Sequence, residues 1–156
     1  MTVIRKSLRP SVRRLSPARA MIAAAAVCAL ASPALSQTAE ADAPITVELN
    51  KLAPNGESCQ ATIVVRNGGG PLSSLKTDLV MFAPDGIVAR RIAVELGPLA
   101  RNKTFVKAFD IPGTGCDRIG RILLNDVIAC ADADGAALAC LDRVEPTSLS
   151  AVTFDK

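Results

Sequence analysis

Cysteine is the residue type with the most chemical potential in this chain of 156 residues, which contains five of them. The positions are Cys28, Cys59, Cys116, Cys130 and Cys140. No pair has the Cys-x-x-Cys spacing that is typical of thiol redox catalysis. The cysteines could therefore form disulfides or remain as reactive thiols, and the redox state of the compartment decides between the two.

Histidine is absent from the chain. Its absence excludes Ser-His and Cys-His nucleophile pairs, histidine metal triads and the usual proton shuttle near neutral pH. Carboxylate pairs remain, but nothing in the sequence places two of them in one cleft. We therefore expect no enzymatic activity, no catalytic residue and no cofactor.

Acidic residues are frequent near the C-terminal end, where Asp132-Ala133-Asp134-Gly135 partly matches a calcium-binding loop. The match fails, because the first acidic position of such a loop falls on Cys130 and its closing Glu falls on Leu141. Asp-Gly is also typical of a tight turn, which is the favoured interpretation. Asp126 and Asp142 nearby keep a calcium or small-ligand carrier as an alternative function.

Basic residues are concentrated at the N-terminus. Six of the 18 basic residues, and none of the 15 acidic residues, lie within residues 1–36, so the remaining chain has a net charge of −3. This balance argues against nucleic acid or anionic lipid as a partner. Arg90 and Arg91 could form a ligand patch with Arg66 or Lys107, but in a strand adjacent side chains point to opposite faces, so we expect a structural role that discourages edge pairing.

Residues 1–36 have the features of a cleaved signal peptide. The uncharged run over residues 20–31 follows the basic part, and small residues stand one and three positions before an expected cut at Gln37. The run is shorter than the ~20 residues that cross a bilayer. We therefore expect a periplasmic or secreted chain with no transmembrane segment. Arg13-Arg14 suggests the twin-arginine (Tat) pathway, and general secretion is the alternative. In an oxidising compartment, the even count of four cysteines after Cys28 predicts two structural disulfides, with three possible pairings.

After a small, acidic stretch over residues 37–44, which we expect to be a disordered tether, the sequence has the pattern of one all-β domain over residues 45–156. Short runs with alternating apolar and polar residues are separated by turn signals, which predicts an immunoglobulin-like antiparallel β-sandwich of about seven strands. The expected strands cover residues 45–50, 60–66, 75–82, 87–96, 103–111, 118–130 and 147–154. Pro84-Asp85-Gly86 predicts a tight turn between the third and the fourth. Residues 118–130 also fit a helix, but a strand with a bulge is favoured because the run is rich in branched residues.

The predicted topology selects one disulfide pairing. Successive antiparallel strands place Cys59 and Cys116 at one end of the sandwich, and Cys130 and Cys140 at the other. Bridged Cα atoms must lie within ~7 Å, so the expected disulfides are Cys59–Cys116 and Cys130–Cys140. In this interpretation the four cysteines are structural site residues, and no metal ligand is predicted.

Three segments resemble a known family: Ser73-Ser74-Leu75-Lys76-Thr77-Asp78-Leu79-Val80-Met81-Phe82-Ala83-Pro84-Asp85-Gly86-Ile87-Val88-Ala89-Arg90-Arg91, residues 92–99, and Arg121-Ile122-Leu123-Leu124-Asn125-Asp126-Val127. The chain is similar to an uncharacterised family of small exported bacterial proteins that is described by a twin-arginine pathway signal sequence. The resemblance covers most of residues 45–140. It implies an envelope location and supports the twin-arginine route, and it brings no activity and no catalytic residue. We therefore expect a periplasmic binding or envelope-interaction module whose partner is an envelope protein.

Overall fold

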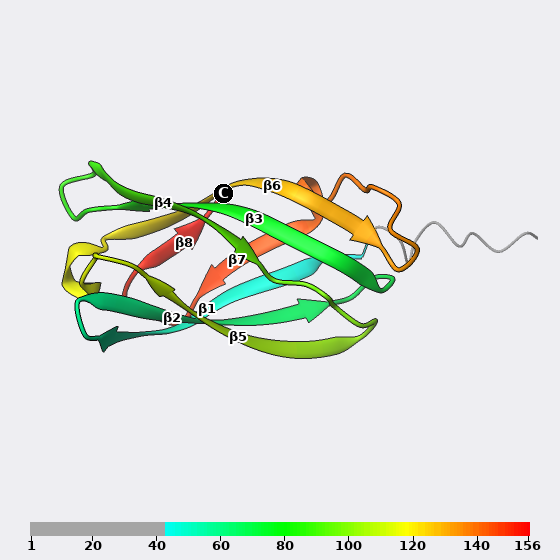
Figure 1. Cartoon of the computed structure of the whole chain (residues 1–156), viewed down its shortest axis with the longest axis horizontal. Helices are drawn as coiled ribbons and strands as arrows, with labels where there is room; N and C mark the ends of the chain where they lie inside the picture. The colour runs from blue at the N-terminus through cyan, green and yellow to red at the C-terminus, as the bar shows by residue number, and fades with distance from the viewer. Residues whose placement is uncertain (1–42) are drawn as a thin grey trace, which may run out of the picture. The chain divides into compact units, whose positions relative to one another are not determined.

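Residues 43–156 form two β-sheets in the computed structural model, which describes this part of the chain (Figure 1). The strands are β1 (Ile45–Asn55), β2 (Ser58–Asn67), β3 (Leu72–Phe82), β4 (Val88–Glu95), β5 (Lys103–Ile111), β6 (Arg121–Asp132), β7 (Val144–Ser148) and β8 (Thr153–Asp155). One sheet has the order β5-β2-β1-β7 and the other β4-β3-β6-β8. The predicted all-β sandwich is confirmed, and its helical content within these residues is limited to the short 3-10 turns η1 (Cys116–Arg118) and η2 (Leu141–Arg143).

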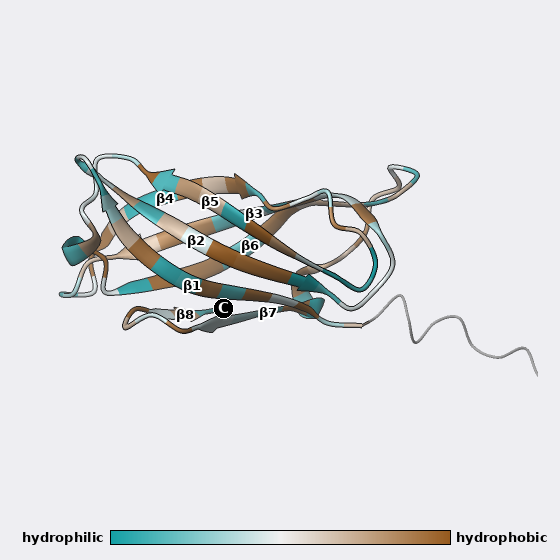
Figure 2. Ribbon diagram, turned by 90° about the horizontal axis from the view of Figure 1, so that it is seen from below, coloured by the Kyte–Doolittle hydropathy of each residue, from teal (hydrophilic) through white to brown (hydrophobic). Residues whose placement is uncertain are grey.

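The core lies between the two sheets and is made mainly of branched aliphatic side chains. Buried residues alternate with more exposed ones along β1 and β2, and Figure 2 shows the matching bands of apolar and polar residues along the strands. Leu49 of β1, Ile63 of β2, Met81 of β3 and Leu124 of β6 are each no more than 2% exposed. The period-two alternation of the sequence therefore specifies the buried face of β1 and β2, whereas β3 is buried on both faces over residues 77–81.

The C-terminal strand differs from the prediction. The expected strand over residues 147–154 is two strands, since β7 pairs with β1 and β8 pairs with β6, both in parallel. Ser148, the last residue of β7, and Ser150 make the turn: Ser148 Oγ donates to Val152 O at 2.7 Å and accepts from Ser150 N at 3.1 Å. Local hydroxyl–backbone hydrogen bonds of this kind compete with a continuous strand and let the chain pass from one sheet to the other.

Residues 121–132 form strand β6, so the helical alternative for this segment is wrong. Its pairing with β3 is antiparallel and shifts register between Lys76 and Thr77 and again between Asp78 and Leu79. At these shifts Ile128 and Asn125 have no opposite residue in β3, which is the arrangement of a β-bulge. The predicted strand with a bulge is confirmed, with more than one irregularity.

Both predicted disulfides are present. Cys59 at the start of β2 is bonded to Cys116 of η1, with their Cα atoms 4.8 Å apart. Cys130 near the end of β6 is bonded to Cys140, with their Cα atoms 6.2 Å apart. The strand-direction argument that selected this pairing is therefore confirmed.

The predicted turn between β3 and β4 is confirmed, and residues 37–42 of the expected tether lie outside the described residues. Gly86 has a φ of 83° and donates to Ala83 O at 2.9 Å, as expected for the tight turn between β3 and β4. Ala43 and Pro44, the last residues of the expected tether, are hydrogen-bonded to the sandwich, since their carbonyl oxygens accept from Arg143 and Gly68. The predicted signal peptide lies outside the described residues. Within residues 43–156, no helix has the length and apolar character needed to cross a membrane.

Candidate functional site

The basic residues singled out from the sequence do not converge. Arg90 and Arg91 point to opposite faces of β4, as predicted. Arg90 Nη2 donates to Pro112 O at 2.6 Å, Arg66 pairs with Glu48 at 3.3 Å, and Lys107 Nζ donates to Gly97 O at 3.3 Å.

The structure therefore separates the residues of the hypothetical basic patch, and each has its own structural contact. Only Arg91 belongs to a larger polar cluster, on the outer face of β3, β4 and β6.

The acidic stretch at the end of β6 forms a turn. Asp132 Oδ1 accepts hydrogen bonds from the backbone amides of Asp134 at 3.0 Å and Ala136 at 2.8 Å, and Gly135 has a φ of 85°. This is the turn interpretation of Asp-Gly made from the sequence. Within residues 43–156, no three His, Cys, Asp or Glu side chains lie close enough together to hold a metal ion. Asp126 and Asp142 therefore do not complete a calcium site with the residues of this turn.

The most unusual side chain on the outer face is Asp78, a carboxylate in the middle of β3 that is only 4% exposed. Arg91 Nε and Nη2 donate to its two oxygens at 2.7 to 3.0 Å, and Asn125 Nδ2 donates at 2.7 Å. The hydrogen bond from Arg91 is the largest of the effects that hold the pKa of Asp78 below its ordinary value, and it outweighs the opposing effect of burial. The Arg91 side chain itself is 65% exposed, so its guanidinium is fixed on one side and open to a partner on the other.

The strand registers explain how these three residues meet. Asp78 lies opposite Ala93 of β4, whose small side chain leaves room for Arg91 from the neighbouring position to lie over the carboxylate. Asn125 occupies the β6 bulge, and a bulge changes the direction of a side chain relative to the regular strand. The cluster therefore depends on a long side chain beside a short one and on an irregularity in β6.

Apolar side chains continue this face toward the β3–β4 turn. Val80 is 8% exposed, Phe82 and Leu123 are half-buried, and Val88, opposite Phe82, is 55% exposed. We call this set the outer patch, and its members are Asp78, Val80, Phe82, Val88, Arg91 and Leu123. Arg121 borders it, 5.3 Å from the centre of the Phe82 ring and paired with Asp155 at 2.8 Å. The outer patch thus combines a fixed arginine, an aromatic ring and aliphatic groups.

The outer face of the other sheet is more polar. Four residues of β2 share this face: Gln60, Thr62, Val64 and Arg66. Arg66 pairs there with Glu48. Val106 of β5, opposite Val64, is the counterpart of Val88, since it is 65% exposed. The two faces of the sandwich therefore differ in chemistry while offering a matched valine on each.

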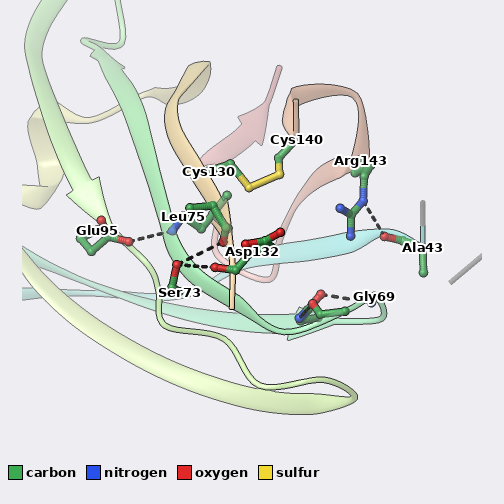
Figure 3. The surroundings of a disulfide bond; sticks show 12 residues. Ala43, Gly69, Ser73, Leu75, Glu95, Cys130, Asp132, Cys140 and Arg143 are labelled. Atoms are coloured by element: carbon green, nitrogen blue, oxygen red, sulfur yellow. Dashed lines mark hydrogen bonds between the residues drawn. A yellow bond between two sulfur atoms is a disulfide. The ribbon is translucent and has the colours of Figure 1, made fainter. Parts of the chain in front are cut away.

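A hollow of about 420 Å³ lies beside the Cys130–Cys140 disulfide, between the loop before β3 and the turns that follow β6 (Figure 3). Arg143 of η2 reaches into this region and donates from Nε to Ala43 O at 3.1 Å. Its Nη2 atom is buried and has no hydrogen-bond partner. This hollow is separate from the outer patch and shares no residue with it.

Asp78 and Asn125 were not identified as site residues from the sequence. A signal was present, because Asp78 directly precedes Leu79-Val80-Met81-Phe82, which is apolar on both faces, and a charged residue inside such a strand needs a partner. Glu95 was missed as well: its Oε1 accepts from the amides of Leu75 and Gly97, both at 2.9 Å. Burial raises the pKa of Glu95, but these hydrogen bonds outweigh it, so the pKa lies below its ordinary value.

Comparisons with known proteins place the chain in no family. No protein-family model matches it, and no curated protein matches it. Among solved structures it is similar to IrmA from Escherichia coli, with 15% sequence identity, a TM-score of 0.49, and coverage of 66% of this chain and 90% of that chain. A similarity at this level carries no argument about function.

Proposed function

We propose that this chain is an exported, disulfide-stabilised binding module that docks an envelope protein through the outer patch and has no enzymatic activity. The observation that carries the proposal is the exposed guanidinium of Arg91, which the buried carboxylate of Asp78 holds in place on the same face as Val80 and Phe82. Arginine and aromatic side chains contribute a large share of the binding energy at protein interfaces.

The fixed position of Arg91 is what distinguishes it from an ordinary surface arginine. A free arginine side chain loses about 0.5–1.5 kcal/mol of conformational entropy when an interface immobilises it. Three nitrogen–oxygen contacts of 2.7 to 3.0 Å to Asp78 already restrict the Arg91 side chain. Binding of a partner to this guanidinium therefore costs less conformational entropy of the Arg91 side chain than binding to a free arginine would.

Export is the second part of the proposal, and it is supported by the leader and by the disulfides. Structural disulfides persist in oxidising compartments such as the periplasm. The resemblance to small exported bacterial proteins agrees with this location, and Arg13-Arg14 favours the twin-arginine route.

Neither a redox role nor a calcium-carrier role is favoured by a specific observation. A redox protein needs a disulfide that a thiol can attack. Both cysteines of Cys130–Cys140 are no more than 6% exposed, and in Cys59–Cys116 Cys59 is buried while Cys116 is half-buried. A calcium carrier needs converging carboxylates, and one oxygen of Asp132 is already bonded to two backbone amides.

Paired valine variants test the binding proposal. The protein, purified from the periplasm of its host, is immobilised and exposed to envelope extract, and each retained protein is then purified and titrated against the variants. Val88→Glu should abolish binding of the partner, because it places a charge in the apolar half of the outer patch. Val106→Glu, the matched change on the other sheet, should leave the affinity unchanged. Equal loss of binding with both variants, or loss of binding with Val106→Glu alone, would contradict the assignment of the outer patch as the binding site.

Export is tested by the intact mass of the periplasmic protein. We expect a chain that begins at Gln37 and carries four oxidised cysteines. Replacement of Arg13 and Arg14 by lysine should block export if the twin-arginine route is used and should leave it unchanged under general secretion. A cytoplasmic protein with an intact N-terminus would contradict the proposal.

A further inference from the structure

The hollow beside the Cys130–Cys140 disulfide has the size and the walls of a small-molecule site. Its volume of about 420 Å³ falls within the range of ligand pockets, about 300–1,000 Å³. Pro71, Leu72 and Leu138 contribute apolar walls, and Leu138 is 40% exposed although it is a large aliphatic residue. An apolar group bound there would cover this exposed surface.

Several bonds hold the walls of the hollow in place. The disulfide joins β6 to the residue before η2, and Leu138 N donates to Cys130 O at 2.9 Å. Asp132 N donates to Ala136 O at 3.0 Å, and Ser73 of β3 donates through Oγ to Asp132 O at 2.5 Å. The site is therefore formed before any ligand binds, which lowers the cost of ordering on binding.

One wall carries a guanidinium without a carboxylate partner. Arg143 makes no ion pair with any of residues 43–156, and in Figure 3 its side chain donates one hydrogen bond, from Nε to Ala43 O. Its Nη2 is enclosed without an acceptor, and a buried donor left unpaired costs about 1–3 kcal/mol. Arg143 as a whole is partly exposed and lines the hollow, so a ligand carboxylate can pair with the part of its side chain that borders this space.

The other wall is acidic. Asp132 and Asp134 both line the hollow, and neither carboxylate pairs with Arg143 although all three border the same space. Oδ1 of Asp132 accepts the two hydrogen bonds of the turn. Asp134 contributes to this turn through its backbone amide and not through its carboxylate. Opposite charges thus border one hollow without forming an ion pair, and apolar side chains line the same space.

We propose that this hollow binds a small zwitterion with an apolar body, of the class of apolar amino acids and dipeptides. The ligand carboxylate faces Arg143, its ammonium group faces Asp132 and Asp134, and its side chains contact Pro71, Leu72 and Leu138. The site is independent of the outer patch, so either assignment can fail without the other.

Derivatives of a dipeptide that each lack one charge test the two charged contacts of the proposed ligand. The periplasmic protein, labelled with ¹⁵N, is titrated with leucyl-leucine while its amide resonances are followed. We expect saturable shifts at Gly70, Leu138 and Ala139. The N-acetylated dipeptide and the C-terminal amide, which each lack one charge, should bind about tenfold more weakly or worse, since each loses a charge-assisted hydrogen bond. Free leucine in a parallel titration distinguishes an amino-acid site from a dipeptide site.

One variant and a matched control assign the ammonium end of the ligand. Asp134→Asn should weaken the binding of leucyl-leucine and leave that of its N-acetyl derivative unchanged, because the derivative has no ammonium group. Asp142→Asn, an exposed aspartate that does not line the hollow, is the matched control. No saturable shift, equal binding of all three dipeptides, or an equal effect of the control would overturn the proposal.

Discussion

The two disulfides should differ in how much they stabilise the domain, and the difference is set by the length of chain that each closes. Cys59 and Cys116 are 57 residues apart in sequence, whereas Cys130 and Cys140 are 10 residues apart. Two double variants remove one bridge each: Cys59→Ala with Cys116→Ala, and Cys130→Ala with Cys140→Ala. Each deletes two sulfur atoms, so the loss of packing is similar and either variant serves as the control for the other.

The size of the effect follows from the entropy of the unfolded chain. A cross-link restricts the unfolded ensemble more when the closed loop is longer, and for these two separations the chain-entropy relation gives about 4.2 and about 2.7 kcal/mol. The variant without the long bridge should therefore be less stable than the variant without the short bridge by about 1.5 kcal/mol.

Urea unfolding at pH 7, followed by circular dichroism, measures the difference. We expect both variants to show a larger dependence of the unfolding free energy on urea than the parent, because their unfolded chains expose more surface. If the variant lacking Cys130–Cys140 were the less stable of the two, the explanation by loop length would be refuted.

Three further outcomes are expected. Asp78 and Glu95 have a pKa below the ordinary value, so they stabilise the fold above the unfolded-state pKa of about 4 and lose this contribution as the pH falls through their folded-state values. The melting temperature should thus be constant from pH 7 to about 5 and fall below about pH 4, with a shallower fall in Asp78→Asn; an equal fall in this variant would contradict the role of Asp78. Leu124→Ala, at a side chain 1% exposed, should cost about 2–5 kcal/mol in urea unfolding, whereas Val106→Ala should change the stability by less than about 0.5 kcal/mol. Millimolar calcium should leave the melting temperature unchanged, because Asp132 is already bonded within its turn, and a rise of several degrees would restore the carrier hypothesis.

The fold was predictable where local pattern and global topology agree. Alternation placed Leu49, Ile63 and Leu124 in the core, and strand direction alone paired the four cysteines correctly. The path of residues 144–156 was not predictable in this way. Its change of sheet depends on hydrogen bonds from the hydroxyl groups of Ser148 and Ser150 and on space beside β1 and β6. Neither feature produces a periodic pattern of residues in the sequence.

The candidate sites were less predictable than the fold, because both are assembled from residues far apart in the chain. Asp78 meets Asn125, 47 residues away, only because β6 bulges at that position. Arg143 contacts Ala43, which is 100 residues away. Sequence reasoning considered Arg91 together with Arg66 and Lys107, and it had no means of knowing that a carboxylate on the neighbouring strand would hold this arginine instead.

The most direct test of the proposed function is site-specific photo-crosslinking in living cells. A photoreactive amino acid replaces Val88 in one strain and Val106 in another, and both positions are exposed valines on opposite sheets. We predict a discrete covalent adduct with one envelope protein from position 88 and none from position 106. Adducts of equal yield at both positions, or an adduct from position 106 alone, would contradict the assignment of the outer patch as the binding face.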